Sequence, residues 1–199
     1  MRTIKKVASH IFIDGFGGMT QGLFATLIIG TMIQQIGLLI GGSTGNVIYL
    51  LGKAAAALTS AGIGVGVAVK YGESPLVTVS AAVAAMVGGY AGKITGGTFF
   101  VDGNAVLSGP GEPLGAFIAA FAGITCGHLV SGKTKVDIIV TPVITIGAGS
   151  VVGLLVGPPI SQMMTGLGSI INWATEQRPF IMGIVVSVVM LSLIHISEP

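Results

Sequence analysis

The sequence predicts an all-α protein, a polytopic transmembrane helical bundle with a re-entrant or irregular loop between spans three and four. Of its 199 residues, 52% are hydrophobic and only 8% are charged, whereas ordinary soluble domains carry roughly 25% charged residues. The hydrophobic residues occur in runs of about 20, long enough to cross about 30 Å of hydrocarbon as helix. The 33 glycines fit close helix contacts in lipid, where small residues let backbones approach each other.

Charges and helix-breaking residues divide the apolar regions into separate spans. Five complete spans are predicted, at residues 17–40, 47–69, 76–94, 114–130 and 136–156. Glycine costs about 1 kcal/mol against alanine in a helix interior, so three alternate glycines predict a break or hinge in the second span: Gly62, Gly64 and Gly66. Glycines also recur at every fourth residue and predict stripes of close helix packing, as at Gly149, Gly153 and Gly157.

The region after the fifth span is less regular. The Gly-Pro-Pro sequence of residues 157–159 predicts the end of that helix, because proline lacks a backbone donor and clashes with the preceding turn. Two readings are open for residues 160–175: a helix at the membrane interface, with Trp173 among the headgroups, or a re-entrant segment. Residues 180–190 are predicted to begin a sixth span.

The last residues, 191–199, read LSLIHISEP and resemble the translation of a sequencing-library adapter. We therefore expect this stretch to be an artefact and exclude it from the reasoning on the fold. The membrane domain is predicted to occupy residues 1–190, as the N-terminal fragment of a longer protein.

Positive charges fall mainly on one side of the predicted spans. If the spans alternate in direction, one face carries the groups before span one and after spans two and four: Arg2, Lys5, Lys6, Lys70, Lys133 and Lys135. By the positive-inside rule this face is cytoplasmic, which predicts a cytoplasmic N-terminus. Lys93 and Arg178 fall on the opposite face and weaken the bias without reversing it.

A polar segment, residues 95–115, separates the third and fourth spans. Its core, GPGEP at residues 109–113, cannot form continuous helix, so backbone groups and a carboxylate become available to a polar ligand at membrane depth. Glu112 either binds such a ligand or caps the next helix, and Asp102 and Asn104 either bind it or form a turn. The predicted substrate-binding residues are Glu112, Gly111, Gly109, Asn104 and Asp102.

Signatures of soluble enzymes are missing from the sequence: it has no phosphate loop, nucleotide fingerprint, paired-histidine metal motif or nucleophile elbow. We therefore expect no catalytic residue, metal or cofactor in this chain, and no nucleic-acid partner. The single cysteine, Cys126, excludes an internal disulfide. His128 is either satisfied at the end of the fourth span or is a proton-sensitive group that faces a partner.

Two stretches resemble a known family: FIDGFGGMTQGLFATLIIGTMIQQIG at residues 12–37 and LSGPGEPLGAFIAAFAG at residues 107–123. They are similar to the membrane component IIC of the bacterial sugar phosphotransferase system, in particular to its stand-alone branch that resembles the perfringolysin regulator. The resemblance implies a permease of the bacterial inner membrane whose sugar is phosphorylated by a separate IIB protein, with the phosphoryl-carrier residues on other proteins. It also implies a homodimer, and it matches Glu112 to a glutamate that contacts the sugar in related proteins.

Two other functions are open beside this permease. A membrane-bound regulator could sense a small molecule and control gene expression without transport. An ion-coupled secondary transporter is disfavoured, because no acid lies securely inside a predicted span.

Overall fold

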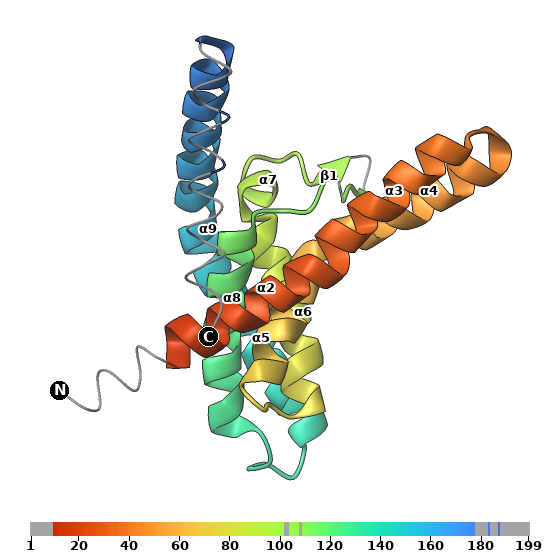
Figure 1. Cartoon of the computed structure of the whole chain (residues 1–199). Helices are drawn as coiled ribbons and strands as arrows, with labels where there is room; N and C mark the ends of the chain where they lie inside the picture. Colours follow the sequence, from red (N-terminus) through yellow and green to blue (C-terminus); the bar gives the residue numbers. More distant parts are fainter. Residues whose placement is uncertain (1–9, 102–103, 108, 178–182, 184–186, 188–199) are drawn as a thin grey trace. The chain divides into compact units, whose positions relative to one another are not determined.

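The computed structural model describes residues 10–101, 104–107, 109–177, 183 and 187 (Figure 1). The chain divides into two compact units, Met1–Pro159 and Ile160–Pro199. Among the described residues, three helices are long and apolar enough to cross a membrane, or four if one bent pair counts as a single span. Apart from one two-stranded hairpin and the turns, the described chain is helical, which confirms the predicted all-α membrane fold.

The first span is a continuous helical stretch with two π-helical sections. In chain order its parts are η1 (His10–Gly15), α2 (Phe16–Leu23), η2 (Phe24–Ile28) and α3 (Ile29–Ile40). Gly41 then reverses the chain with φ 66°, a left-handed conformation that glycine adopts without steric cost. The returning arm consists of α4 (Gly42–Ala57) and α5 (Thr59–Lys70), and Figure 1 shows α3 and α4 side by side as arms of this hairpin.

Glycines bring the two arms of this hairpin into backbone contact. A methyl group added at Gly18 would lie 2.6 Å from the carbonyl oxygen of Gly66, and one at Gly37 would lie 2.5 Å from the nitrogen of Tyr49. Similar contacts follow along the hairpin, at the pairs Gly22–Gly62 and Gly30–Gly52. Any larger residue at these positions would force the helices apart.

The second span is broken, as predicted, but the break lies at Leu58 and not at the alternate glycines. There α4 and α5 meet at an angle of 52°. Helix α5 is continuous through the glycines because their bare faces are filled by neighbouring backbones: Gly66 meets Gly18, and Gly64 meets Ala81. The π-helical section η2 lies opposite the break, since a methyl group at Gly62 would touch Thr26 at 2.7 Å.

The core of the first unit lies between α5, α6 (Pro75–Gly89) and α8 (Pro113–Val130). Ser74 caps α6 by accepting a hydrogen bond from the Val77 amide at 3.4 Å. The buried core residues are mostly small: Ile63, Val67, Ala68, Val77, Ala81, Ala85, Ala116, Phe117, Ala120 and Ile124. Small side chains let these helices pack closely, and α6 and α8 touch directly where Gly88 meets Gly115.

The third predicted span, residues 76–94, is divided into two helices. Helix α6 ends at Gly89, Tyr90 leaves helical geometry with φ −105° and ψ 9°, and α7 (Ala91–Thr95) follows. The irregular stretch before α8 contains a small antiparallel hairpin of β1 (Phe100–Val101) and β2 (Asn104–Ala105). The predicted irregular segment between spans three and four is thus confirmed.

Helix α9 (Asp137–Gln177) corrects the predicted end of the fifth span. It continues through Pro158 and Pro159, so residues 160–175 belong to the same helix and are not a separate segment. Each proline removes only one backbone hydrogen bond, a loss that membrane helices tolerate when other groups compensate. The sixth span and the terminal stretch lie almost wholly outside the described residues.

The glycine stripe at the start of α9 packs as predicted. Methyl groups at Gly149 and Gly157 would lie 2.6 Å from Ala84 and 2.5 Å from Ala91, and one at Gly153 would lie 2.8 Å from the Gly88 Cα.

Gly18→Ala tests the backbone contact between α2 and α5. The three atoms nearest to the added methyl group are backbone atoms within 3 Å, which cannot move aside as a side chain can. We therefore expect a loss of about 1–3 kcal/mol of stability, measured by thermal unfolding in detergent. Gly147→Ala is the matched control: nothing lies within 4 Å of the added group, and alanine favours helix by about 1 kcal/mol. Equal effects of the two substitutions would contradict the packing role of Gly18.

Candidate functional site

The candidate site is a docked loop, residues 109–112, which immediately precedes α8. It lies against two helix interruptions, the one at Leu58 between α4 and α5 and the one at Tyr90 between α6 and α7. Regular helix is therefore interrupted at three places that meet here: between α4 and α5, between α6 and α7, and before α8. Backbone groups that a helix would satisfy internally are here available for other partners.

Two buried hydroxyl groups hold the first half of this docked loop. The Ser60 hydroxyl donates to the carbonyl oxygen of Pro110 at 2.9 Å. The Tyr90 hydroxyl lies within hydrogen-bond distance of two carbonyl oxygens, that of Gly109 and, at 3.2 Å, that of Ala57 at the end of α4.

A backbone hydrogen bond holds the second half and explains the interruption at Tyr90. The Glu112 amide donates to the carbonyl oxygen of Gly89 at 2.7 Å. In a continuous helix that oxygen would accept from the amide of Lys93, which instead donates to the carbonyl of Tyr90 at 2.9 Å. The helix break thus frees the Gly89 carbonyl oxygen from its helical donor, and the docked loop supplies a donor in its place.

The docked loop requires glycine at two positions. Gly109 and Gly111 have φ 80° and 76°, in the left-handed region that favours glycine. A methyl group at Gly111 would also collide with the Ser60 hydroxyl and lie 3.1 Å from the carbonyl oxygen of Gly89. The loop backbone therefore approaches α5 and α6 more closely than any other residue type would allow.

Glu112 is the acidic residue of this site. It stands half-buried at the N-cap of α8, before Pro113 at the first helical position. Burial raises the pKa of Glu112 above its usual value, and the backbone N–H of Leu114 opposes this rise in part. Ionised, the carboxyl group accepts hydrogen bonds; protonated, it also donates one.

The structure brings together three of the five predicted site residues, Glu112, Gly111 and Gly109. Asn104 lies in β2, exposed and opposite Val101, and so belongs to the hairpin and not to the docked loop. Asp102 lies outside the described residues.

Ser60 and Tyr90 were not among the site residues predicted from the sequence. Ser60 reaches Pro110 across 50 positions of the chain, so no local pattern could have identified it. The Gly88-Gly89-Tyr90 sequence was a weaker signal, since each glycine costs about 1 kcal/mol against alanine in a helix interior.

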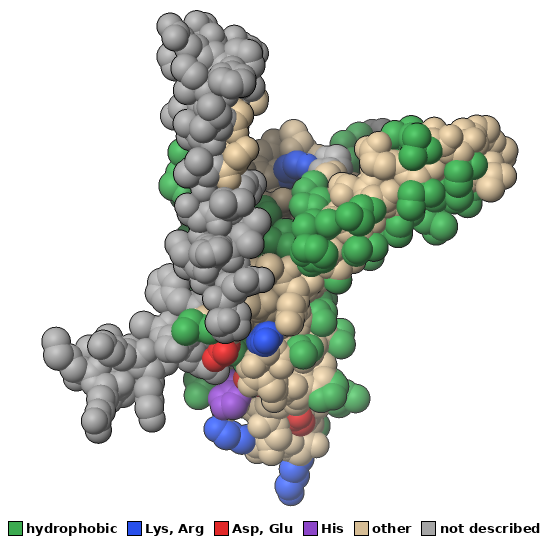
Figure 2. Space-filling view, in the orientation of Figure 1, with side chains coloured by type: hydrophobic (Ala, Val, Ile, Leu, Met, Phe, Trp, Pro, Cys, Tyr) green, Lys and Arg blue, Asp and Glu red, His purple; other side chains and the backbone are tan. Residues whose placement is uncertain are grey.

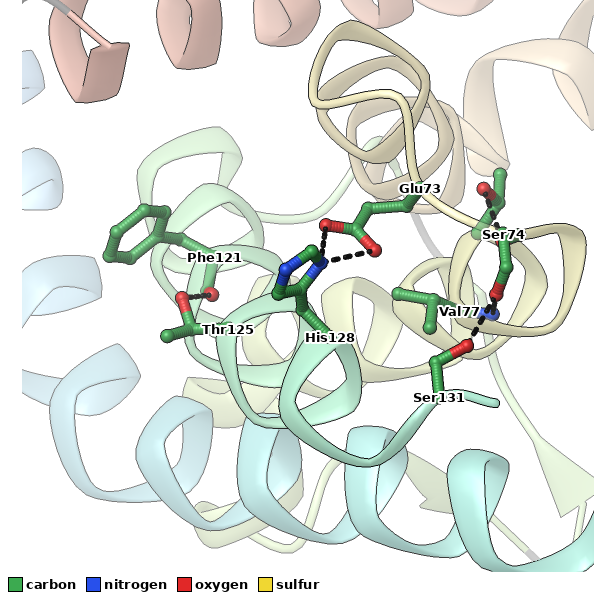
Figure 3. Close-up of polar contacts among 8 residues, drawn as sticks. Glu73, Ser74, Val77, Phe121, Thr125, His128 and Ser131 are labelled. Carbon is green, nitrogen blue, oxygen red and sulfur yellow. Dashed lines mark hydrogen bonds and ion pairs between the residues drawn. The ribbon is translucent and has the colours of Figure 1, made fainter. Parts of the chain in front are cut away.

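A second polar cluster lies at the other end of α6 and α8 (Figure 3). His128 Nδ1 is 3.0 Å from Glu73 Oε1, with the His128 side chain 71% exposed and that of Glu73 only 8% exposed. Beside this pair the hydroxyls of Ser74 and Ser131 lie 3.0 Å apart. His128 therefore fits the reading of a histidine satisfied at a helix end.

The same end carries exposed cations and one further acid. Asp137 Oδ1 accepts from the Gly132 amide at 2.9 Å and from the Thr141 hydroxyl at 2.6 Å, which ties the turn to the start of α9. Figure 2 shows basic, acidic and histidine side chains gathered at this end, while hydrophobic side chains dominate the surface of α3 and α4. Within the described part of the chain, no group of three or more His, Cys, Asp or Glu side chains could hold a metal ion.

Comparison with known proteins identifies a family. The family model described as "Phosphotransferase system, EIIC" matches residues 13–197. No curated protein and no solved structure matches the chain. The match confirms the family resemblance of the sequence, whereas the perfringolysin regulator-like branch and the status as a fragment stay predictions.

The raised pKa of Glu112 makes folding stability depend on pH. A carboxyl group with a higher pKa in the folded state stabilises the fold below its ordinary value of 4.5, and this contribution is lost as pH rises through the folded-state pKa. We therefore expect the melting temperature of Glu112→Gln to rise relative to wild type as pH increases from 4.5, measured by thermal unfolding in detergent between pH 4 and 8. A difference that stays constant over this range would contradict the shift.

Proposed function

The chain belongs to the phosphotransferase system EIIC family, and on this premise we propose that the docked loop at residues 109–112 is its sugar-binding element. The family and the apolar helices make the chain a membrane-embedded component of a sugar permease. Glu112 would bind the sugar, with Gly109 and Gly111 shaping the backbone around it. Asn104 and Asp102 are proposed as secondary contacts.

The observation that carries this proposal is the position of Glu112 where three helix ends meet. A carboxylate accepts strong hydrogen bonds from hydroxyl groups, and a sugar presents several of them in a fixed pattern. The N-terminus of α8 adds partial positive charge that favours the ionised carboxyl group. Its half-burial keeps the group accessible while reducing competition from water.

The length of α6 supports a site at membrane depth. Its 15 residues extend for roughly 22 Å, less than the hydrocarbon thickness of about 30 Å. If the turn between α5 and α6 lies at one membrane surface, Gly89 lies several Å short of the other. The docked loop attached to Gly89 would then be re-entrant, and its polar backbone would be tolerated because it is packed against protein.

In this mechanism sugar enters from outside and binds to Glu112. A rearrangement of the helices then exposes it to a phosphorylated IIB protein on the cytoplasmic side, which supplies the phosphoryl group. The turn between α8 and α9, with exposed Lys133 and Lys135, is proposed to face that partner. A homodimer is expected by the same family resemblance.

Sugar binding to purified protein tests this function. Loss of a charged hydrogen bond is worth about 1.5–3 kcal/mol, so Glu112→Gln should weaken the affinity for the sugar that binds best about 10–100-fold, measured by isothermal titration over a panel of sugars. Glu73→Gln, which removes a carboxylate at the other end of α6, should bind as wild type. Equal binding by Glu112→Gln and wild type would remove Glu112 from the site, and a lack of binding by any sugar would favour the regulatory function.

Labelling of single cysteines tests the orientation. In a Cys126→Ser background, Ser43→Cys places one exposed thiol at the start of α4, just after the reversal at Gly41, and Lys133→Cys places one in the turn between α8 and α9. A membrane-impermeant maleimide should label the first in intact cells and the second only after the membrane is opened. The reverse pattern would place the N-terminus outside.

A further inference from the structure

We propose that Ser60 and Tyr90 are positioning residues, which fix Glu112 to the break between α4 and α5 by holding Gly109 and Pro110 of the docked loop. The role of Glu112 in this inference rests on the proposed function, but the link between the docked loop and the break does not. It predicts that the bend of the α4–α5 arm and the burial of Glu112 change together.

The hydrogen bond of Ser60 differs from those of other helical hydroxyl groups in the described part of the chain. Serine and threonine within helices commonly donate to a carbonyl three or four residues earlier in the same helix. Thr26, Ser80 and Thr125 do so at 2.7 Å each. Ser60, with 0% exposure, instead donates to a loop 50 residues away, so its hydroxyl group is committed to the docked loop.

Tyr90 connects the docked loop to the end of α4. Its side chain is also fully buried, and its hydroxyl lies between the carbonyl oxygens of Gly109 and Ala57. The ring is fixed by Phe99, whose centroid lies 5.4 Å away. The Tyr90 hydroxyl therefore contacts both the docked loop and the last residue of α4, while the Tyr90 backbone leads into α7.

These contacts lie on both sides of the helix break. Ala57 ends α4, whereas Ser60 belongs to the first turn of α5, and the 52° bend lies between them. A change of this bend moves the partner of Tyr90 relative to Ser60, so the two hydroxyls cannot keep both loop carbonyls in place. Glu112 lies two residues after Pro110, and its backbone then keeps two hydrogen bonds: its amide donates to the Gly89 carbonyl oxygen, and its own carbonyl oxygen accepts from the Ala116 amide at the start of α8.

Chemical modification of Glu112 measures this positioning without a sugar. Dicyclohexylcarbodiimide reacts with protonated carboxyl groups, so the pH profile of labelling, read by peptide mass spectrometry, follows the protonation of Glu112. That protonation depends on how well the docked loop keeps water away from the carboxyl group. Two titratable groups lie near the docked loop on this side: Tyr90, between α6 and α7, which contacts the loop, and Lys93 of α7, whose Nζ lies 5.3 Å from the centroid of the Tyr90 ring. Tyr90→Phe removes the first of them. Both Tyr90→Phe and Ser60→Ala should move the profile to lower pH, because a released loop lets water reach the carboxyl group.

The size of the effect follows from one lost hydrogen bond. If about 1 kcal/mol is lost from the protonated form of Glu112, the ratio of protonated to ionised carboxyl group changes roughly fivefold. At the midpoint pH of the wild type the labelled fraction should then fall from one half to about one sixth, a roughly threefold loss. Tyr49→Phe and Ser80→Ala are matched controls that remove the same atoms away from the docked loop, and they should label as wild type. Tyr90→Phe and Ser60→Ala each test the positioning role independently, and the melting temperature of each variant verifies that it is folded.

Two results would overturn the inference: no labelling of wild-type Glu112 at any pH, or a profile of a folded test variant that coincides with the wild type. A failure of the proposed function looks different, since sugars would not bind while the labelling profiles still shifted. If sugar binding depends on Glu112 but the profiles coincide, the sugar site stands and the positioning role of Ser60 and Tyr90 is wrong.

Discussion

Contact between helix backbones at glycine residues is the constraint on which the rest of this structure depends. Lipid supplies no hydrophobic drive between helices, so packing must come from close approach. Gly18 and Gly66 illustrate it in the first hairpin, and Gly88 and Gly115 do so between α6 and α8. In each pair the carbonyl of one residue occupies the space where the other would carry a side chain.

This close packing lets short, irregular elements meet inside the first unit. Ser60 can reach Pro110 because Gly111 carries no side chain between them, and Gly89 can accept from the Glu112 amide because its own face is bare. The glycines that tighten the bundle also permit the docked loop. The loop then supplies hydrogen-bond partners for helix ends that would otherwise leave polar groups unsatisfied.

Apolar runs were sufficient to predict the helices but not where they are interrupted. The break in the second span was expected at Gly62 to Gly66 and lies at Leu58, because those glycines pack against neighbouring backbones and keep their helical bonds. The prolines at 158 and 159 were expected to end a helix and do not. At the glycines of α5, local propensity was outweighed by partners that are distant in sequence.

By itself the sequence determined the membrane-helix class, the irregular segment between the third and fourth spans, and the family to which the chain belongs. These properties depend on composition and local order, which are visible in one dimension. Only the tertiary structure decided that Ser60 and Tyr90 hold Gly109 and Pro110, and that Asn104 belongs to a separate hairpin. Such contacts join residues that are far apart in the chain, and they exist only once the helices have packed.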